Sequence, residues 1–386
     1  MHTHILWGAS ATAGMAALAV LGLPGAGPAV ASVVRAPSAG PQIAYVVSLD
    51  ANTVTPINTA TNKAGSPIRV GVNPNAIAIT PNGRTAYVTN SGSATVTPIS
   101  TATNRAGKPI KVGTFPASIA ITPDGKTAYV SGGGNGTVTP ISTATNRAGK
   151  AINVPGAGDL AITPNGKTVY VASSNGTVTP ISTVTNKAGT AIKVGKTTGD
   201  IVVTPDGKAA YVTIGIGDLN ADTVRPINTT TNTAEKPIVV GTAPSAIIIT
   251  PNGTTAYVAC FHVHIPISQG SVWPINIATG KAGTPIKVAG FPTHFAVIPT
   301  GKTVYVTTGQ GVTPIRTATN SAGQAFPAGS GPWAIALTAD GAAGYVTDDG
   351  TGMNPADTVT PFRTATNTVG KAIKVGLSPV AIALTP

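Results

Sequence analysis

The sequence predicts an all-β fold built from a repeated unit, and two observations carry that prediction. The 386 residues are rich in glycine (46), in proline (33) and in Thr, Val and Ile, the composition of short strands joined by tight turns. A tyrosine in an Ala/Val/Gly-Tyr-Val triplet recurs every 40 to 48 residues, at Tyr45, Tyr87, Tyr129, Tyr170, Tyr211, Tyr257, Tyr305 and Tyr345. This period is the length of a propeller blade, so we expect a β-propeller of eight four-stranded blades, with seven blades and one irregular unit as the alternative.

Each unit reads as four strands, named A to D. In one unit "SIAIT" (118–122) is strand A, "TAYVS" (127–131) strand B, "TVTPIST" (137–143) strand C and "AINV" (151–154) strand D. The A–B turn "TPDGKT" has the Pro, Asp/Asn and Gly order of a tight turn, and the C–D turn "TNRAG" again pairs Asn with Gly. The small residues that alternate in strand A fit an innermost strand, where neighbouring blades crowd together.

The two ends of the repeat region predict how the ring closes. The repeats begin with a strand B, "IAYVV", and end with a strand A within "VAIALTP", which finishes at Pro386. We therefore expect the last strand A to pair with the first strand B. Residues 42–386 then form a single propeller domain.

The repeat "AYVTN…TVTPISTATNRAGKPIKVG…AIAITPDGKTAYV" resembles the YVTN-family β-propeller repeat of secreted and surface-layer proteins, over nearly all of residues 42–386. The resemblance implies the propeller fold. It also implies either a surface protein or, as in related propellers, a lactonase or a lyase that opens lactone antibiotics. Because propellers host many chemistries, the fold alone does not choose between these functions.

The N-terminus predicts export. Residues 1–31 contain an apolar run of small residues and end in Ala29-Val30-Ala31, the pattern of a cleaved signal peptide, and residues 32–41 read as a short linker. Glycine and prolines interrupt the run, so we expect no transmembrane anchor after cleavage. The mature protein would be secreted, extracellular or associated with the cell wall.

The formal net charge of +12 is expected to divide between two faces of the ring. A–B and C–D turns share one face, the turn face, while B–C loops and D–A crossings share the other, the loop face. The turn face would carry ten basic residues: Arg84, Lys126, Lys167, Lys208, Lys302, Lys63, Arg105, Arg147, Lys187 and Lys281. This charge favours an anionic cell-wall polymer, although turn lysines that only maintain solubility are the alternative. Few aromatic residues interleave the charges, so no nucleic acid is expected.

The loop face holds most of the departures from the repeat, which favours it as the binding face. Its candidate ligand-binding residues are Asp218, Asn220, Asp222, Asp348, Asp349 and Asp357. "DLNAD" (218–222) has the opening of a calcium loop, but Thr229 stands where an EF-hand has Glu, which leaves only a looser calcium site.

The start of strand A predicts a second group of candidates. Most units have a small residue there, near the mouth of the central channel, but Asp159, Asp200 and His294 replace it in three units. His294 could act as a general base, with Asp200 or Asp159 orienting it or serving as the acid.

An unusual B–C loop, "CFHVH", carries metal-ligand types. Cys260, His262 and His264 alternate, so a continued strand would place them on one side, and His294 could complete a zinc site. The alternative is a long hairpin with idle histidines. Cys260 is the only cysteine, so the chain forms no intramolecular disulfide.

Three functions remain open at this point. The first is a binding scaffold for an unknown ligand, or for a surface protein or glycan, through the loop face. The second is a lactonase- or lyase-like enzyme at the channel mouth, with or without a divalent metal. The third is a structural component of the cell wall or surface layer. No cofactor is certain from the sequence.

Overall fold

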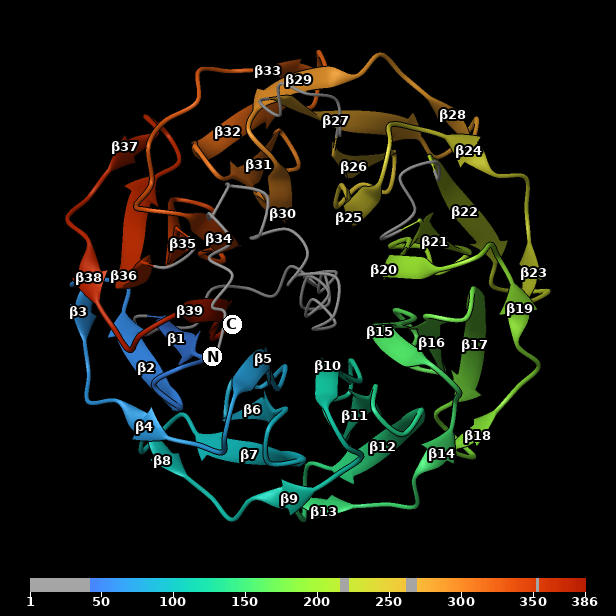
Figure 1. The fold of residues 1–386 in the computed structure, drawn as a ribbon, viewed down its shortest axis with the longest axis horizontal. Helices are drawn as coiled ribbons and strands as arrows, with labels where there is room; N and C mark the ends of the chain where they lie inside the picture. Colours follow the sequence, from blue (N-terminus) through green and yellow to red (C-terminus); the bar gives the residue numbers. More distant parts are fainter. Residues whose placement is uncertain (1–41, 216–221, 262–268, 352–353) are drawn as a thin grey trace, which may run out of the picture.

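The computed structural model describes residues 42–215, 222–261, 269–351 and 354–386, which form a ring of eight antiparallel sheets (Figure 1). Each sheet is one blade, so the prediction of eight blades is confirmed over the alternative of seven. Blade 1 contains β1 and β39, and blades 2 to 8 follow in chain order. The described part of the chain contains no helix that could cross a membrane.

Four concentric positions repeat in every blade (Figure 1). The innermost strands, A, are β5 (Pro74–Ile79), β10 (Pro116–Ile121), β15 (Ala157–Ile162), β20 (Thr198–Val203), β25 (Pro244–Ile249), β30 (Pro292–Val297), β34 (Pro332–Leu337) and β39 (Pro379–Leu384). The B strands are β1 (Ile43–Ser48), β6 (Thr85–Asn90), β11 (Thr127–Gly132), β16 (Thr168–Ser173), β21 (Ala209–Ile214), β26 (Thr255–Phe261), β31 (Thr303–Thr308) and β35 (Ala343–Thr351). The C strands are β2 (Thr53–Asn58), β7 (Thr95–Ser100), β12 (Thr137–Ser142), β17 (Thr177–Ser182), β22 (Thr223–Asn228), β27 (Gln269–Asn276), β32 (Gly311–Arg316) and β36 (Asn354–Arg363).

The outer strand D is two short strands rather than the single strand expected. In blade 2, β8 pairs with one end of β7 and β9 with the other, and Pro109 lies between them. Proline has no N–H to donate, which fits a break in pairing, but the same break occurs in blades with alanine at this position, such as Ala151 in blade 3. The outer strands are β3 (Lys63–Ala64), β4 (Ile68–Arg69), β8 (Arg105–Ala106), β9 (Ile110–Lys111), β13 (Arg147–Ala148), β14 (Ile152–Asn153), β18 (Lys187–Ala188), β19 (Ile192–Lys193), β23 (Thr233–Ala234), β24 (Ile238–Val239), β28 (Lys281–Ala282), β29 (Ile286–Ala289), β33 (Ser321–Ala322), β37 (Thr368–Val369) and β38 (Ile373–Lys374).

The ring closes through the two ends of the repeat region, as predicted. Strand β39 pairs antiparallel with β1, with Ala44 opposite Leu384 and Tyr45 opposite Ala383. Blade 1 therefore combines strands from both ends of the repeat region.

The hydrophobic core is divided among the junctions between blades. Eight clusters of buried side chains each join two neighbouring blades. At the junction of blades 1 and 2, Tyr45 and Val54 pack with Ile77 and Val88. Burial of this apolar surface holds adjacent blades together at every junction.

A hydrogen bond to the next blade from seven of the eight buried repeat tyrosines reinforces seven junctions. Tyr129 Oη donates to Asn186 Oδ1 at 2.6 Å, and the same bond recurs from Tyr45, Tyr87, Tyr170, Tyr257, Tyr305 and Tyr345. The accepting Asn lies in the C–D turn with a positive φ, 51° at Asn186, a conformation that Asn tolerates. Tyr211 has no such bond within the described residues, because Gly280 replaces the Asn in the turn of blade 6.

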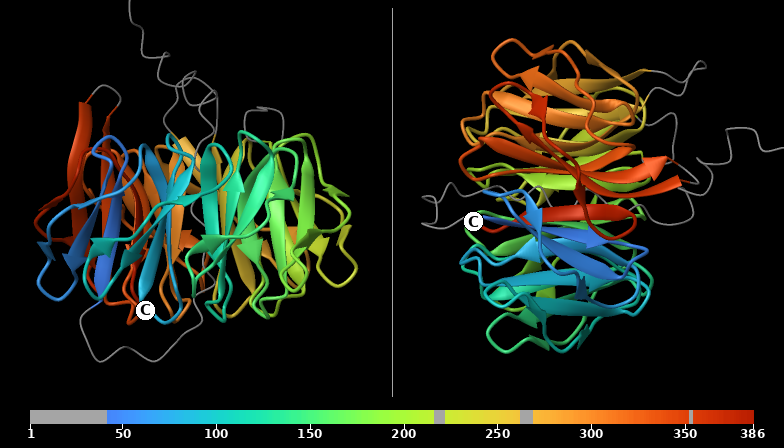
Figure 2. Two further views of the ribbon diagram at one scale, coloured as in Figure 1. Left: turned by 90° about the horizontal axis from the view of Figure 1, so that it is seen from below. Right: turned by 90° about the vertical axis from the view of Figure 1, so that its left-hand side faces the viewer.

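Two chemically different faces result, and the ring is a flat disc between them (Figure 2). On the turn face, Thr101 of a C–D turn donates its backbone N–H to Arg84 of an A–B turn at 3.1 Å. On the loop face, Gly92 of a B–C loop donates to Val72 of a D–A crossing at 3.0 Å. The grouping of turns and loops therefore agrees with the sequence interpretation.

Candidate functional site

A ring of side chains lines the start of the inner strands on the loop face. The equivalent positions are Ala76, Ser118, Asp159, Asp200, Ala246, His294, Ala334 and Ala381. The register between strands A and B is irregular at the start of every inner strand, as between Ala157 and Leu160 in β15. Such irregularities redirect side chains, which here places polar groups between neighbouring inner strands.

Asp159 and Asp200 lie together on the adjacent strands β15 and β20. Ser118 Oγ donates to Asp159 Oδ1 at 2.6 Å, and the N–H of Ile247 donates to Asp200 Oδ2 at 2.9 Å. The side chains are almost fully buried, with exposures of 6% and 1%. Their remaining oxygens, Asp159 Oδ2 and Asp200 Oδ1, are buried and accept no hydrogen bond from a third residue in the described parts of the chain.

The two carboxyl groups influence the pKa values of each other. Burial raises the pKa of Asp159, and burial together with the charge of Asp159 raises the pKa of Asp200 well above its usual value. Protonated Asp200 donates a hydrogen bond to the Asp159 carboxylate, and this bond favours the ionised form of Asp159. Hydrogen bonds from Ser118 and from Ile247 therefore hold the aspartate pair from both sides, so the group spans four blades.

His294 occupies the same repeat position two blades beyond Asp200, on β30. Its imidazole hydrogen-bonds the backbone carbonyl of Trp333 and meets the Trp333 ring edge-on at 5.0 Å between centroids. Nδ1 is buried without a hydrogen-bond partner, and burial lowers the pKa of His294 to about 4. His294 is therefore neutral at pH 7, and no hydrogen bond joins it to Asp159 or Asp200 in the described parts of the chain. A catalytic role for His294 with Asp200 or Asp159 stays a prediction.

Cys260 is a core residue at the end of β26. Its side chain is fully buried and packs with Val240 and Val258, and burial raises the pKa of the thiol to about 12. Asn90 and Asp348 occupy the equivalent end of their B strands, so this position faces the core in several blades. A buried neutral thiol is a poor metal ligand. His262 and His264 lie outside the described residues. Among the residues that the structure does describe, no group of three or more His, Cys, Asp or Glu side chains was found that could hold a metal.

The loop face has an acidic group at the junction of blades 8 and 1. Asp348 is buried, Thr358 and Thr360 donate to its Oδ2 at 2.6 and 3.0 Å, and burial raises its pKa to about 6. Burial and then the charge of Asp50 raise the pKa of Asp349. Negative charge therefore concentrates at this junction.

The other predicted acidic residues are spread out. Asp357 pairs with Lys374 at 3.3 Å between Nζ and Oδ2, and Asp222 lies partly exposed with its carbonyl accepting from Val240. Asp218 and Asn220 lie outside the described residues. The structure thus brings Asp348 and Asp349 together but not Asp222 and Asp357.

An exposed apolar arc on the loop face was not recognised from the sequence. Leu377, Val72 and Phe115 lie in the D–A crossings of the consecutive blades 1, 2 and 3, and they are 40%, 51% and 65% exposed. Ser378, next to Leu377, donates to Asp50 Oδ2 at 2.6 Å, so the arc adjoins the acidic group. Aligning the crossings would have revealed the two large apolar residues and the one aromatic residue.

Phe115 has an unfavourable backbone conformation. Its φ is +50°, and the equivalent positions before the start of strand A hold Asn73, Ala243 and Ser378 with similar angles. A positive φ is a genuine outlier for a bulky side chain. The ring lies beside Gly134 and is still 65% exposed, and it is the only exposed aromatic ring among the large apolar side chains of the described residues.

The comparisons with known proteins show a similarity in fold and nothing more. No protein-family model matches the sequence, and no curated protein matches it. Dihydro-heme d1 dehydrogenase NirN, solved in complex with DHE, is similar in structure, with a TM-score of 0.74 at 14% identity over 93% of this chain and 79% of that one. A functionally unknown protein from Desulfotomaculum acetoxidans gives 0.62 at 18% identity over 89% and 98% of the two chains. Hydrazine synthase of Kuenenia stuttgartiensis gives 0.60 at 21% identity over 79% and 97%.

Proposed function

We propose that the protein is an exported β-propeller that binds a partner through its loop face. The observation that carries the proposal is the exposed apolar arc, and Phe115 within it above all. The resemblance of the repeat to the YVTN family and the signal-like residues 1–31 support a secreted or cell-wall-associated location. A rigid ring with variable loops is suited to recognition.

Phe115 supports this proposal because the fold does not need it. Other blades place a smaller residue at the same backbone conformation, and an aromatic ring there adds strain and exposes apolar surface to water. Strained, exposed residues persist where a contact outside the domain compensates for them. The adjoining carboxylates of Asp50 and Asp349 further favour a partner that presents both apolar and basic groups.

Binding of the labelled mature protein to intact cells of the source organism tests the proposal. Phe115→Asn with Val72→Thr, residues found at equivalent positions in other crossings, should reduce binding at least tenfold. Lys126→Thr with Lys167→Thr on the turn face is the matched control and should retain binding. Equal binding by all three proteins would refute recognition through the loop face.

The aspartate pair favours an enzyme as the second candidate. A buried carboxyl group that holds a proton at neutral pH can serve as a general acid, as a lactonase- or lyase-like reaction at the channel mouth requires. Asp200 would be the acid, hydrogen-bonded to Asp159, and neutral His294 would act separately as a base. Two structural neighbours bear the names of enzymes, a similarity that extends to the fold alone.

A panel of lactones tests the enzyme candidate. Asp200→Asn keeps a hydrogen-bonding side chain but removes the transferable proton, so any turnover should fall by at least about a hundredfold. Turnover that persists in this variant would exclude the pair as the acid. Metal content of the wild type and of the His262→Ala/His264→Ala variant decides separately whether zinc or calcium binds.

A further inference from the structure

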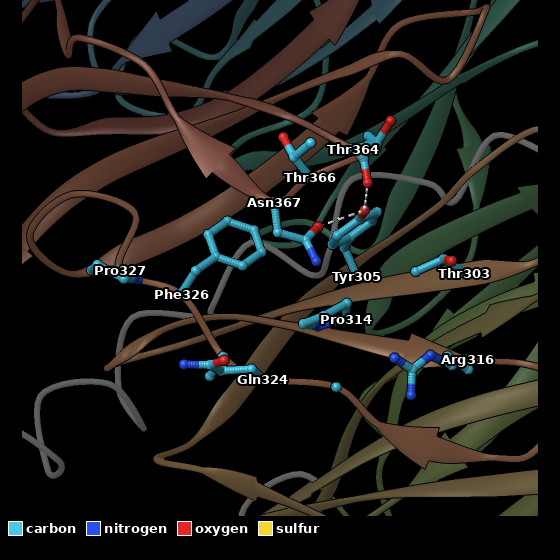
Figure 3. Close-up of a pocket in the computed structure, with 12 residues that line it drawn as sticks. Thr303, Tyr305, Pro314, Arg316, Gln324, Phe326, Pro327, Thr364, Thr366 and Asn367 are labelled. Atoms are coloured by element: carbon cyan, nitrogen blue, oxygen red, sulfur yellow. Dashed lines mark hydrogen bonds between the residues drawn. The ribbon is translucent and has the colours of Figure 1, made fainter.

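A cavity of about 440 Å³ lies between blades 7 and 8 at the turn-face end of the junction. Pro314 and Phe326, both largely buried, line its apolar part, and Tyr305, Arg316, Gln324 and Asn367 supply polar groups (Figure 3). Its volume lies within the range of small-ligand sites, roughly 300 to 1,000 Å³. Neither the loop face nor the channel mouth contributes to it.

The cavity arises because blade 7 departs from the repeat in its outer strand. The other blades end strand D with a short strand that contains Ile, such as Ile110 opposite Val96 in blade 2. Blade 7 has only β33 in the described residues, followed by a single bridge between Val312 and Phe326. Phe326 therefore occupies the register of Ile110 but continues into an irregular segment rather than a strand.

Aromatic packing fixes Phe326 at the edge of the cavity. Its ring centroid lies 5.1 Å from that of Phe362, which lies 5.1 Å from that of Tyr305. Gly344 provides the space for Phe362, because a Cβ there would collide with the Phe362 ring. Three aromatic residues thus form one rigid group at this junction.

The corresponding groove between blades 6 and 7 can be compared with this cavity, because both lie at the same position of the repeat. It is lined by Thr255, Pro274, Asn276 and Asn320, the counterparts of Thr303, Pro314, Arg316 and Asn367, and its volume is about 240 Å³. The groove between blades 7 and 8 is therefore larger and has Arg316 at the position of Asn276, whereas the smaller groove has its cation, Lys281, in the C–D turn. Arg316 is exposed and pairs with no carboxylate among the described residues.

We propose that this cavity binds an acidic saccharide unit, a sugar ring that carries a carboxylate or phosphate group. The apolar face of the sugar would pack on Phe326 and Pro314, and its hydroxyls would bond Gln324 and Asn367. The planar guanidinium of Arg316 binds carboxylate and phosphate groups through two parallel hydrogen bonds. The basic residues of the turn face attract an anionic polymer towards the site.

Titration calorimetry of the mature protein with trigalacturonate and with glucose 6-phosphate tests the site and separates the two anions. Saturable binding of either one, with maltotriose at least tenfold weaker, is expected. Arg316→Asn introduces the residue of the neighbouring groove and should weaken binding at least tenfold. Arg363→Asn, the exposed arginine at the same repeat position in blade 8 but outside the cavity, should leave binding unchanged.

A second variant tests the shape of the cavity. Phe326→Ile restores the residue of the other blades, so it should fold and should weaken binding of both acidic and neutral sugars. Equal losses of affinity in the two arginine variants would show that diffuse charge attracts the ligand, and would overturn the site. Equal affinity for maltotriose, or no saturable binding of any probe, would overturn it as well. These results do not depend on the loop-face partner, because both arginines lie at turn-face ends of C strands.

Discussion

The two faces of the ring are made from the same repeat but differ in how closely the blades resemble one another. On the turn face, a tyrosine of one blade binds an asparagine of the next at seven junctions. On the loop face, the equivalent positions hold Ser118, Asp159, His294 or a simple alanine. Repetition therefore marks the groups that hold the ring together, whereas variation marks the groups available for function.

The aspartate pair combines both roles, and its disruption should have the largest effect on stability. Asp200→Ala leaves the buried N–H of Ile247 without an acceptor and Asp159 without a proton donor, so we expect a loss of about 2 to 4 kcal/mol in the free energy of unfolding. Asp200→Asn can still accept from Ile247 and donate to Asp159, so it should cost less than about 1 kcal/mol. Urea denaturation at pH 7 measures both, and equal losses would contradict the hydrogen-bonded pair.

The tyrosine–asparagine bonds should give the next largest effect. Tyr129→Phe removes the hydroxyl that binds Asn186 at 2.6 Å and should cost about 1 to 1.5 kcal/mol. Tyr211→Phe, at the junction where Gly280 replaces the asparagine, should cost clearly less in the same denaturation assay. Asn186→Gly keeps the positive φ and completes a double-mutant cycle with Tyr129→Phe. A similar loss at both tyrosines would mean that packing, and not the bond, is responsible.

Most of the fold could be predicted from the sequence because the same pattern of strands and turns occurs eight times. The spacing of the tyrosines predicted eight blades, and the order of strands at the two ends predicted the pairing of β39 with β1. The bond between Tyr87 and Asn146 was not predicted, because it joins different blades 59 positions apart. The split of strand D was missed as well, since it occurs both with Pro109 in blade 2 and with Ala151 in blade 3 and so has no single residue as its signal.

The candidate site was less predictable, because burial and side-chain direction decide it. Aligning the repeats placed Asp159 and Asp200 at equivalent positions, and their contact follows from the adjacency of blades 4 and 5. The same alignment gave no sign that His294 would bond Trp333 rather than an aspartate. The sequence suggested Cys260 as a possible metal ligand. In its blade it occupies the same position opposite strand A as Asn90 and Asp348 do in theirs, and this position faces the core.

Asp348 should have a smaller effect on the free energy of unfolding, and this effect should depend on pH. Its pKa is about 6 in the folded protein and 3.8 ordinarily, so between about pH 4 and 6 the folded state binds more protons than the unfolded state. Stability contributed by this group is therefore present below pH 4 and is lost as the pH rises through 6. Asp348→Asn introduces the residue that blade 2 has at the equivalent position, Asn90. Relative to the wild type, the free energy of unfolding of this variant should be higher by about 1 to 2 kcal/mol at pH 8 and unchanged at pH 4.

Denaturation of both proteins from pH 4 to 8 checks this expectation. The wild type also contains Asp349 and the Asp159–Asp200 pair with raised pKa values, so the difference between the two curves is the quantity of interest. An equal gain from Asp348→Asn at every pH would assign the effect to packing rather than to ionisation.

The smallest expected effect on stability belongs to Phe115, the residue on which the loop-face proposal depends. Phe115→Asn places at φ +50° a side chain that tolerates this conformation, so the free energy of unfolding should rise by about 0.5 to 1 kcal/mol. Asn73→Phe in blade 2 is the reverse change at the same repeat position and should cost a similar amount. Urea denaturation of both variants distinguishes two roles for the ring. If Phe115→Asn lowers stability, the ring packs within the domain and the argument for an external partner fails; if stability rises while binding to cells falls, the residue is retained for recognition at the expense of the fold.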